Sequence, residues 1–190
     1  MASQSAGREW QRVEIYSTFL RIQGELLLEP PLRLSDEVNR LVDYLELRNT
    51  TTEPLLSTYA VVSPVEDSTT IEKASIVLIL PEAAEVGRSQ VMWKEKVRHP
   101  VVLNTTAFSM SCYVHLEPKV SLITQLERYE REFLPVTQMS AVAVASVMGL
   151  APGAQPQVLQ RDFALLNPRN IVSFSMRPAE AEAAPQVPGA

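Results

Sequence analysis

Apolar and polar residues alternate in two stretches of the chain, and this alternation predicts strands. The apolar-face positions of the first stretch are Leu20, Ile22, Gly24, Leu26 and Leu28, and those of the second are Phe108, Met110, Cys112, Val114 and Leu116. A period of two is expected of a strand that buries one face. Each stretch follows a shorter apolar one, so the sequence predicts two hairpins that turn at 17–19 and at 105–107.

The period becomes helical after each predicted hairpin. Pro30 and Pro31 end the first hairpin, because proline cannot donate a hydrogen bond to a neighbouring strand. The helical spacing covers Leu34, Val38, Leu41, Val42 and Leu45 in the first case, and Leu122, Leu126, Tyr129 and Phe133 in the second. We expect Ser35 or Asp36 to cap the first helix and Ser121 to cap the second.

Three short strands are predicted after each helix. They cover 44–48, 58–63 and 71–80 after the first helix, and 133–137, 142–148 and 163–176 after the second. We expect the last of them to break near Pro168. Residues 74–80 are apolar on both faces, which indicates a central strand or one that another part of the chain covers.

The two stretches are similar in sequence as well as in pattern. Residues 13–34 align without a gap with residues 101–122, at an offset of 88, and six of these 22 pairs are identical. Ile76 and Val77 match Ile171 and Val172 at an offset of 95, which places about seven extra residues of the second stretch in the loop 149–156. We interpret this similarity as an internal duplication.

Together these elements predict a mainly β protein with a minor α component. It consists of two tandem repeats, each a small five-stranded, strongly curved antiparallel sheet or open barrel with one short helix after its second strand. The predicted segments are a flexible N-terminus at 1–10, repeats at 11–82 and 99–178, a linker at 83–98 and a disordered tail at 179–190. We expect the copies to pack about a pseudo-two-fold axis, as one continuous barrel or as two packed ones.

The run VEIYSTFLRIQGELLLEPPLRLSDEVN, residues 13–39, resembles an uncharacterised bacterial family of small β-domains. The positions that match the family's pattern are Gly24, Arg33, Leu34, Ser35, Asp36 and Asn39, and residues 133–137 and 165–172 are similar to its later strands. The second copy departs from the pattern, with Ser121-Leu122-Ile123-Thr124 at the helix start and Cys112 in place of Gly24. The resemblance implies a β fold rather than an activity.

Composition and charge narrow the function classes. The chain has 190 residues and a formal net charge of −5, which argues against a surface built mainly for phosphate backbones. A single Cys excludes an internal disulfide, and two His residues argue against a conventional zinc site. Residues 1–10 contain no apolar signal region and no apolar run is long enough to span a membrane, so we expect a soluble cytoplasmic protein without a transmembrane segment.

The chemistry-bearing residues predict no catalytic, cofactor or metal site. Cys112 and His115 are three residues apart on one strand, so they lie on opposite faces and cannot pair directly. We expect Cys112 to be a small buried thiol and His115 to be a surface residue. The sequence contains no P-loop, nucleophile elbow or dinucleotide fingerprint. A metal or acid–base site would have to use Asp36, Glu37 and a loop residue.

The linker contains the one local excess of positive charge. Its candidate partner-binding residues are Arg88, Trp93, Lys94, Lys96 and Arg98. Basic residues around an aromatic one can bind single-stranded nucleic acid or an anionic lipid surface. The alternative is a solvated connector with Trp93 packed between the repeats.

A duplicated β-domain with few reactive groups is typical of a binding protein. We expect a non-catalytic protein-interaction or assembly module whose exposed sheet edges bind an unidentified protein, and the chain could also form a homo-oligomer. The first alternative is a nucleic-acid or nucleotide binder that uses a barrel face and the basic linker. The second is an enzyme whose carboxylates converge only in the fold.

Overall fold

A computed structural model of the whole chain describes residues 8–29, 32–40, 43–55, 64–82, 96–128, 132–144 and 157–176. These residues form a mainly β structure with two short α-helices and two 3-10 helices. The elements of the N-half, residues 9–81, are β1 (Glu9–Ser17), β2 (Leu20–Leu28), α1 (Leu34–Arg40), β3 (Tyr44–Pro54), β4 (Glu66–Glu72), η1 (Lys73–Ser75) and β5 (Ile76–Pro81). Those of the C-half, residues 97–176, are β6 (Val97–Thr105), β7 (Phe108–Leu116), α2 (Leu122–Arg128), β8 (Leu134–Ala143), β9 (Val158–Leu166), η2 (Pro168–Asn170) and β10 (Ile171–Met176).

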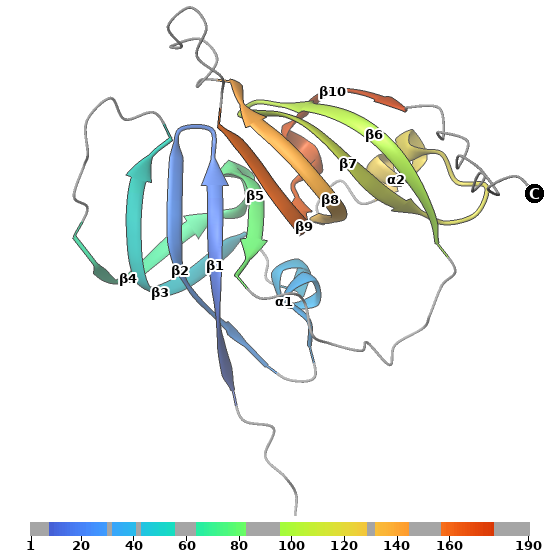
Figure 1. Cartoon of the computed structure of the whole chain (residues 1–190). Coiled ribbons are helices and arrows are strands. Elements are labelled where there is room, and N and C mark those ends of the chain that lie inside the picture. The colour runs from blue at the N-terminus through green and yellow to red at the C-terminus, as the bar shows by residue number, and fades with distance from the viewer. Residues whose placement is uncertain are drawn as a thin grey trace, which may run out of the picture.

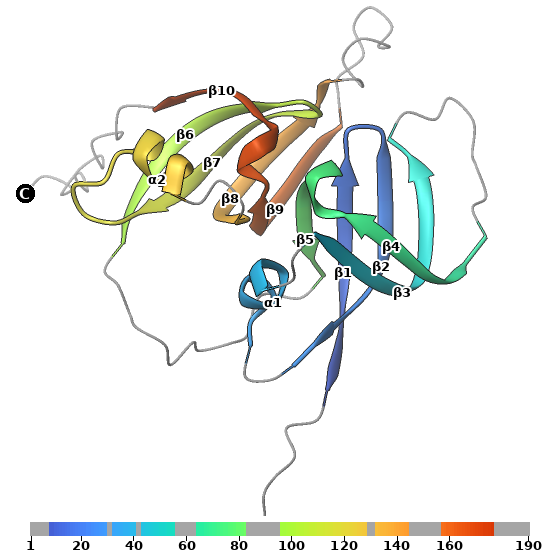
Figure 2. The same cartoon turned by 180° about the vertical axis from the view of Figure 1, so that it is seen from behind.

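The described strands form a single antiparallel sheet that does not close. Its order is β10-β6-β7-β8-β9-β5-β1-β2-β3-β4, so the N-half and the C-half meet where β5 pairs with β9. Figures 1 and 2 show two curved lobes side by side, with α1 beside the place where they join. The strands β4 and β10 are the two edges of the sheet.

The expected pseudo-two-fold packing of two sheets is wrong. The halves join edge to edge, and the strands that meet are β5 and β9, which occupy different places in the order of their halves. A two-fold axis would instead bring the same strand of each half together. The halves are therefore related head to tail, and the two ends of the sheet are unlike each other.

Both predicted hairpins are confirmed, and the same hydrogen bonds close their turns. The hydroxyl of Ser17 accepts hydrogen bonds from the backbone N–H groups of Phe19 at 3.2 Å and Leu20 at 2.9 Å. The hydroxyl of Thr105 accepts from Ala107 at 3.2 Å and from Phe108 at 2.8 Å. Short hydroxyl side chains commonly satisfy turn N–H groups in this way.

The two predicted helices are present, but each is only seven residues long. Ser121 has its expected capping role, because its hydroxyl accepts a hydrogen bond from the N–H of Thr124 at 3.1 Å. Helix α1 begins at Leu34, so Ser35 and Asp36 lie in its first turn. The assignment of Leu45 to this helix is wrong: Leu45 lies in β3, opposite Ile71, and is fully buried.

The strands after the helices start and end elsewhere than predicted. Strand β3 continues six residues beyond the predicted end at Arg48, and the predicted strand at 58–63 lies outside the described residues. The reason for the continuation is a bulge, where the register against β2 shifts between Gln23 and Glu25 and Asn49 takes a φ of 50°. The predicted strand at 71–80 is two strands, separated by η1.

The C-half shows the same departures. Strand β8 runs from Leu134 to Ala143, its register against β7 shifts between Ser111 and Tyr113, and Gln138 has a φ of 48°. Most of the predicted strand at 142–148 lies outside the described residues. The predicted break near Pro168 is confirmed, because η2 separates β9 from β10 there.

The core consists of two clusters, and each contains residues of both halves. The first combines Tyr16, Leu78 and Leu80 with the apolar face of the C-half, and the second combines the core of the N-half with Phe133 and Leu165. All six residues of β5 are buried, which confirms a covered strand for residues 76–80 of the predicted range 74–80. Residues 74 and 75 of that range lie in η1 and are exposed. No helix among the described residues is long and apolar enough to cross a membrane.

A methyl group added at Gly24 should destabilise this fold, because a Cβ there would lie 2.7 Å from Cγ2 of Thr50 and 3.1 Å from the carbonyl oxygen of Arg48. We expect Gly24→Ala to lower the free energy of unfolding by about 1–3 kcal/mol in a urea titration. Thr50→Ser removes the contacting methyl group and keeps the hydroxyl that meets Thr69 at 2.6 Å. Gly24→Ala should therefore cost less in the Thr50→Ser background, and an equal cost in both backgrounds would contradict this account.

Candidate functional site

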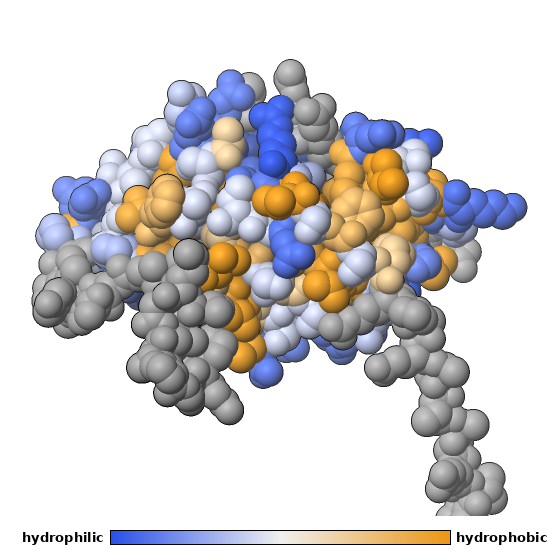
Figure 3. Space-filling model, turned by 90° about the horizontal axis from the view of Figure 1, so that it is seen from above, coloured by the Kyte–Doolittle hydropathy of each residue, from blue (hydrophilic) through white to orange (hydrophobic). Residues whose placement is uncertain are grey.

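The two edges of the sheet differ in charge and polarity. Edge strand β4 has the sequence EDSTTIE, with three acidic residues, whereas β10 has the sequence IVSFSM and no charge. Val172 and Met176 of β10 are 70% and 44% exposed. Figure 3 views the side of the molecule that includes β10, and shows hydrophobic patches among hydrophilic side chains. An uncharged edge strand with exposed apolar side chains is a template for pairing with another strand.

The N-half and the C-half meet where β5 pairs with β9, and we call this contact the junction. It shows how an edge of this sheet pairs with a further strand. Leu78 pairs with Leu166 and Ile79 with Leu165. The N–H of Asn167 then donates to the carbonyl of Val77 at 3.0 Å. The side chains of Leu165 and Leu166 are fully buried, and they belong to different core clusters. Consecutive strand residues point to opposite faces, so this pair anchors the strand on both sides of the sheet.

Asparagine side chains complete the junction. Asn167 is 5% exposed, and its amide donates to the carbonyl of Lys73 at 3.0 Å and to that of Ile76 at 2.8 Å. Asn170 donates to the same carbonyl of Ile76 at 2.8 Å. These amides add side-chain hydrogen bonds to the main-chain carbonyls along the turn through η1, where the carbonyl of Lys73 also accepts from the N–H of Ile76.

Further contacts join the halves away from the paired strands. The amide of Asn39 in α1 accepts from the N–H of Phe133 at 2.7 Å and donates to its carbonyl at 3.3 Å. The rings of Tyr16 and Phe108 meet edge to face, with centroids 5.3 Å apart. Together with the junction, these contacts fix one half against the other.

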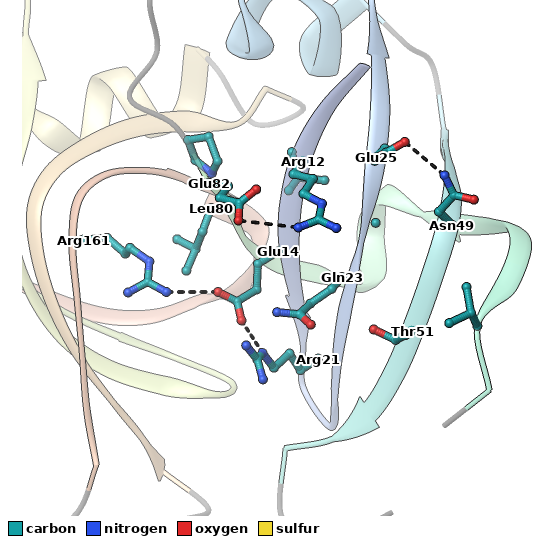
Figure 4. Close-up of a pocket in the computed structure, with 14 residues that line it drawn as sticks. Arg12, Glu14, Arg21, Gln23, Glu25, Asn49, Thr51, Leu80, Glu82 and Arg161 are labelled. Atoms are coloured by element: carbon teal, nitrogen blue, oxygen red, sulfur yellow. Dashed lines mark hydrogen bonds and ion pairs between the residues drawn. The ribbon is translucent and has the colours of Figure 1, made fainter. Parts of the chain in front are cut away.

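A polar cleft of about 540 Å³ lies beside the junction on the face of β1, β2 and β3. Figure 4 shows the Glu14 carboxylate between two guanidinium groups. It accepts from Arg21 and lies 3.2 Å from the guanidinium of Arg161 on β9. Arg12 lies 3.8 Å from Glu82. The arginines and glutamates in this cleft are equal in number and are paired with one another or with neighbours, so the cleft does not have the positive excess that an anion site needs.

Burial raises the pKa of two titratable groups near the core. Burial, with the nearby charge of Glu14, raises the pKa of Tyr16 to about 12. Burial alone raises the pKa of Cys112 to about 12, and its side chain is 3% exposed, as predicted for a small buried thiol. Both groups therefore stay protonated near neutral pH.

Two cationic side chains are also shifted. Burial lowers the pKa of Lys73, and the charges of Asp43 and Glu132 act against this shift. Burial, with the charges of Lys96 and Arg98, lowers the pKa of His115. His115, expected to be a surface residue, is half-buried, and its Nε2 lies 2.9 Å from the hydroxyl of Thr137.

The carboxylates proposed for a metal or acid–base site do not converge. Glu37 is 3% exposed and its Oε1 lies 2.7 Å from the guanidinium of Arg40. Asp36 accepts a hydrogen bond from the N–H of Arg33 at 3.4 Å. The described residues contain no group of three or more His, Cys, Asp or Glu side chains that could hold a metal ion.

The candidate residues of the linker are only partly described. Arg88, Trp93 and Lys94 lie outside the described residues. Lys96 and Arg98 are both exposed. Arg98 lies in β6, and its guanidinium stacks 3.6 Å above the ring of Tyr113 and donates to Gln138. Arg98 is thus occupied by contacts within the sheet.

The asparagines of the junction were not identified from the sequence as site residues. Asn167 follows two leucines at the end of an apolar run and precedes a proline, which is an ordinary signal for a turn. Its partners are carbonyl groups more than 90 residues earlier in the chain, so no local pattern identifies them.

Comparison with protein-family models, with curated proteins and with solved structures gave no match to this chain. The resemblance of residues 13–39 to a family of small β-domains therefore stays a prediction.

Removing the amide donor of Asn167 should destabilise the junction. Asn167→Asp keeps the size of the side chain but replaces two donated hydrogen bonds with a carboxylate facing two carbonyl oxygens. We expect a loss of about 2–4 kcal/mol in the free energy of unfolding at pH 7. The loss should shrink as the pH falls, because a protonated carboxyl group can donate one of the bonds.

The matched control is Asn104→Asp. Asn104 is exposed and donates to the hydroxyl of Ser173 at 3.0 Å. This change should cost less than about 1 kcal/mol, since water can replace the lost partner. Equal losses for the two variants would show that Asn167 has no special role in the junction.

The single thiol should be unreactive in the native protein. With a pKa of about 12, on the order of one Cys112 side chain in ten thousand is a thiolate at pH 8. We expect iodoacetamide to modify the native chain at pH 8 no faster than the chain unfolds, and to modify the same chain rapidly in denaturant. Stoichiometric labelling of the native protein within minutes would contradict the burial of Cys112.

Proposed function

We propose that this chain is a non-catalytic protein-interaction module, built from two copies of one β-domain, and that it takes up an extended segment of a partner protein along β10. The observation that carries the proposal is the uncharged, exposed edge formed by β10. Strand addition to an open edge gives affinity through main-chain hydrogen bonds and specificity through side-chain contacts.

The order of elements supports the duplication. Each half consists of two strands, an α-helix, two strands, a 3-10 helix and a final strand. The halves also share the hydroxyl that closes the hairpin turn and the bulge beside a residue with positive φ, Asn49 in one half and Gln138 in the other. These features fall at offsets of 88 or 89 residues, close to the offset of the sequence match.

The chemistry of the described residues supports a non-catalytic role. The charges of the cleft beside the junction are paired, the thiol and the buried phenol stay protonated, and the carboxylates of α1 do not converge with others. Catalysis needs groups whose protonation changes near the working pH, or a nucleophile with a base beside it. A binding role needs neither.

The alternative function is nucleic-acid binding through the basic linker, and an experiment must distinguish it from protein binding at β10. Its residues that the structure describes, Lys96 and Arg98, provide two positive charges, one of them stacked on Tyr113. A phosphate-binding mode would make the interaction strongly dependent on salt.

The proposal predicts that one substitution on β10 abolishes binding of the partner protein. The experiment is affinity capture from native lysate with the tagged full-length chain, its Val172→Asp variant and its Val65→Asp variant. Val172 and Val65 are 70% and 69% exposed, so each change adds one carboxylate at a similarly exposed apolar position. We expect a stoichiometric protein to stay bound at low salt and at about 0.5 M salt, to be lost with Val172→Asp and to be kept with Val65→Asp.

Equal thermal unfolding of the two variants is the control for folding. A partner that is kept by Val172→Asp would contradict strand addition at β10. Nucleic acid that is retained at low salt, lost at high salt and unaffected by Val172→Asp would support the linker instead.

A further inference from the structure

Strands β5 and β10 occupy corresponding places in their halves. Each follows a 3-10 helix, and each begins with an isoleucine whose N–H donates to the first carbonyl of that helix, Lys73 for Ile76 and Pro168 for Ile171. Each pairs on one side with the first strand of its half, β5 with β1 and β10 with β6. The difference lies on the other side: β5 is covered by β9, whereas β10 is an edge of the described sheet.

The pairing of β5 with β9, which β10 lacks in the described sheet, changes the exposure of the second residue of the strand. Val77 and Val172 are the second residues of β5 and β10, and Val77 is fully buried whereas Val172 is 70% exposed. A strand added to β10 in the way that β9 lies against β5 would cover the apolar side chain of Val172, which is now in water.

The strand that covers β5 shows which chemistry fits this kind of edge. Leu165 and Leu166 enter opposite faces of the sheet. Asn167 donates its amide to the carbonyl of Lys73 in η1 and to that of Ile76, the first residue of the covered strand. The carbonyl of Ile76 is one of these acceptors, and that of Ile171 has the corresponding place at β10. The acceptors are main-chain groups, so β10 can offer the same hydrogen bonds although its side chains differ.

We propose that β10 binds, antiparallel, a partner segment that contains two consecutive large apolar residues followed by asparagine, the chemistry of 165–167 in this chain. The inference rests on the proposed function, and it adds the sequence class of the partner segment. The two apolar side chains cover both faces of the edge, and the asparagine amide satisfies the carbonyls where β10 begins.

The chain's own free edge does not meet this requirement. In β4 the residues that correspond to 165–167 are Thr70, Ile71 and Glu72. Glu72 comes just before η1 as Asn167 comes just before η2, and both residues have an extended backbone. A carboxylate cannot donate a hydrogen bond, and it would face carbonyl oxygens. Two copies therefore do not join β4 to β10 as β9 joins β5, and β10 stays open to another protein.

The test uses the full-length chain and labelled synthetic peptides, with fluorescence anisotropy as the readout. The probe is the capped peptide of residues 158–170, VLQRDFALLNPRN. Its matched control has glutamate at the position of Asn167, and a second control is the peptide of residues 64–75, PVEDSTTIEKAS. We expect saturable 1:1 binding of the probe and at least about tenfold weaker binding of both controls, since two amide hydrogen bonds are lost and a charge is added. Val172→Asp should abolish probe binding, and Val65→Asp should leave it unchanged.

Each other result overturns a defined part of the inference. If the glutamate peptide binds as tightly as the probe and both need Val172, the asparagine requirement is wrong while strand addition at β10 stands. If probe binding is insensitive to Val172→Asp, the site is not β10. If no peptide binds, the inferred sequence class is wrong, and the capture experiment with the Val172 variant decides separately whether β10 binds a partner.

Discussion

The pairing of β5 with β9 is the contact on which the rest of the structure depends. It involves only two residue pairs, Leu78 with Leu166 and Ile79 with Leu165, yet it makes one sheet of two halves and gives both core clusters residues from each half. So short a ladder is weak by itself. The amides of Asn167, Asn170 and Asn39 add donors to main-chain carbonyls, and the buried amide of Asn167 tolerates few other arrangements. The junction therefore combines apolar burial, which supplies most of the free energy, with polar contacts that fix the register.

The head-to-tail relation between the halves has a consequence that a two-fold relation would not have. Two unlike strands meet at the junction, so two unlike strands remain at the ends of the sheet, acidic β4 and uncharged β10. A heterologous contact of this kind continues into a filament or a ring unless its ends are changed. Strand β4 ends at Glu72, at the position that corresponds to Asn167 of the C-half, and its carboxylate cannot donate the hydrogen bonds that Asn167 donates at the junction.

The sequence predicted the features that depend on local chemistry. The period of two, the two hairpin turns and the Ser121 cap depend on residues that are close in sequence. The run at 74–80, apolar on both faces, indicated a central or covered strand for the same reason. The strand ends after each helix could not be predicted, because bulges at Asn49 and Gln138 carry β3 and β8 past polar positions that suggest a turn. The junction asparagines were missed for a different reason. Their acceptors are carbonyls in the other half, and a sequence pattern records neither main-chain groups nor long-range pairing.

Charge distribution explains why the candidate surface lies at an edge and not in a cleft. The chain has a net charge of −5, and the described arginines near the cleft are matched by glutamates, so no pocket there has an excess of either sign. Glu14 illustrates the effect: it is held by Arg21 of its own half and by Arg161 of the other, which makes the cleft part of the contact between the halves. Paired charges in such a place stabilise orientation more than they attract ligands. Strand β10 differs from the cleft because it is an edge of the described sheet. Its outer main-chain groups can form hydrogen bonds with a partner, and the side chains of Val172 and Met176 offer that partner an exposed apolar surface.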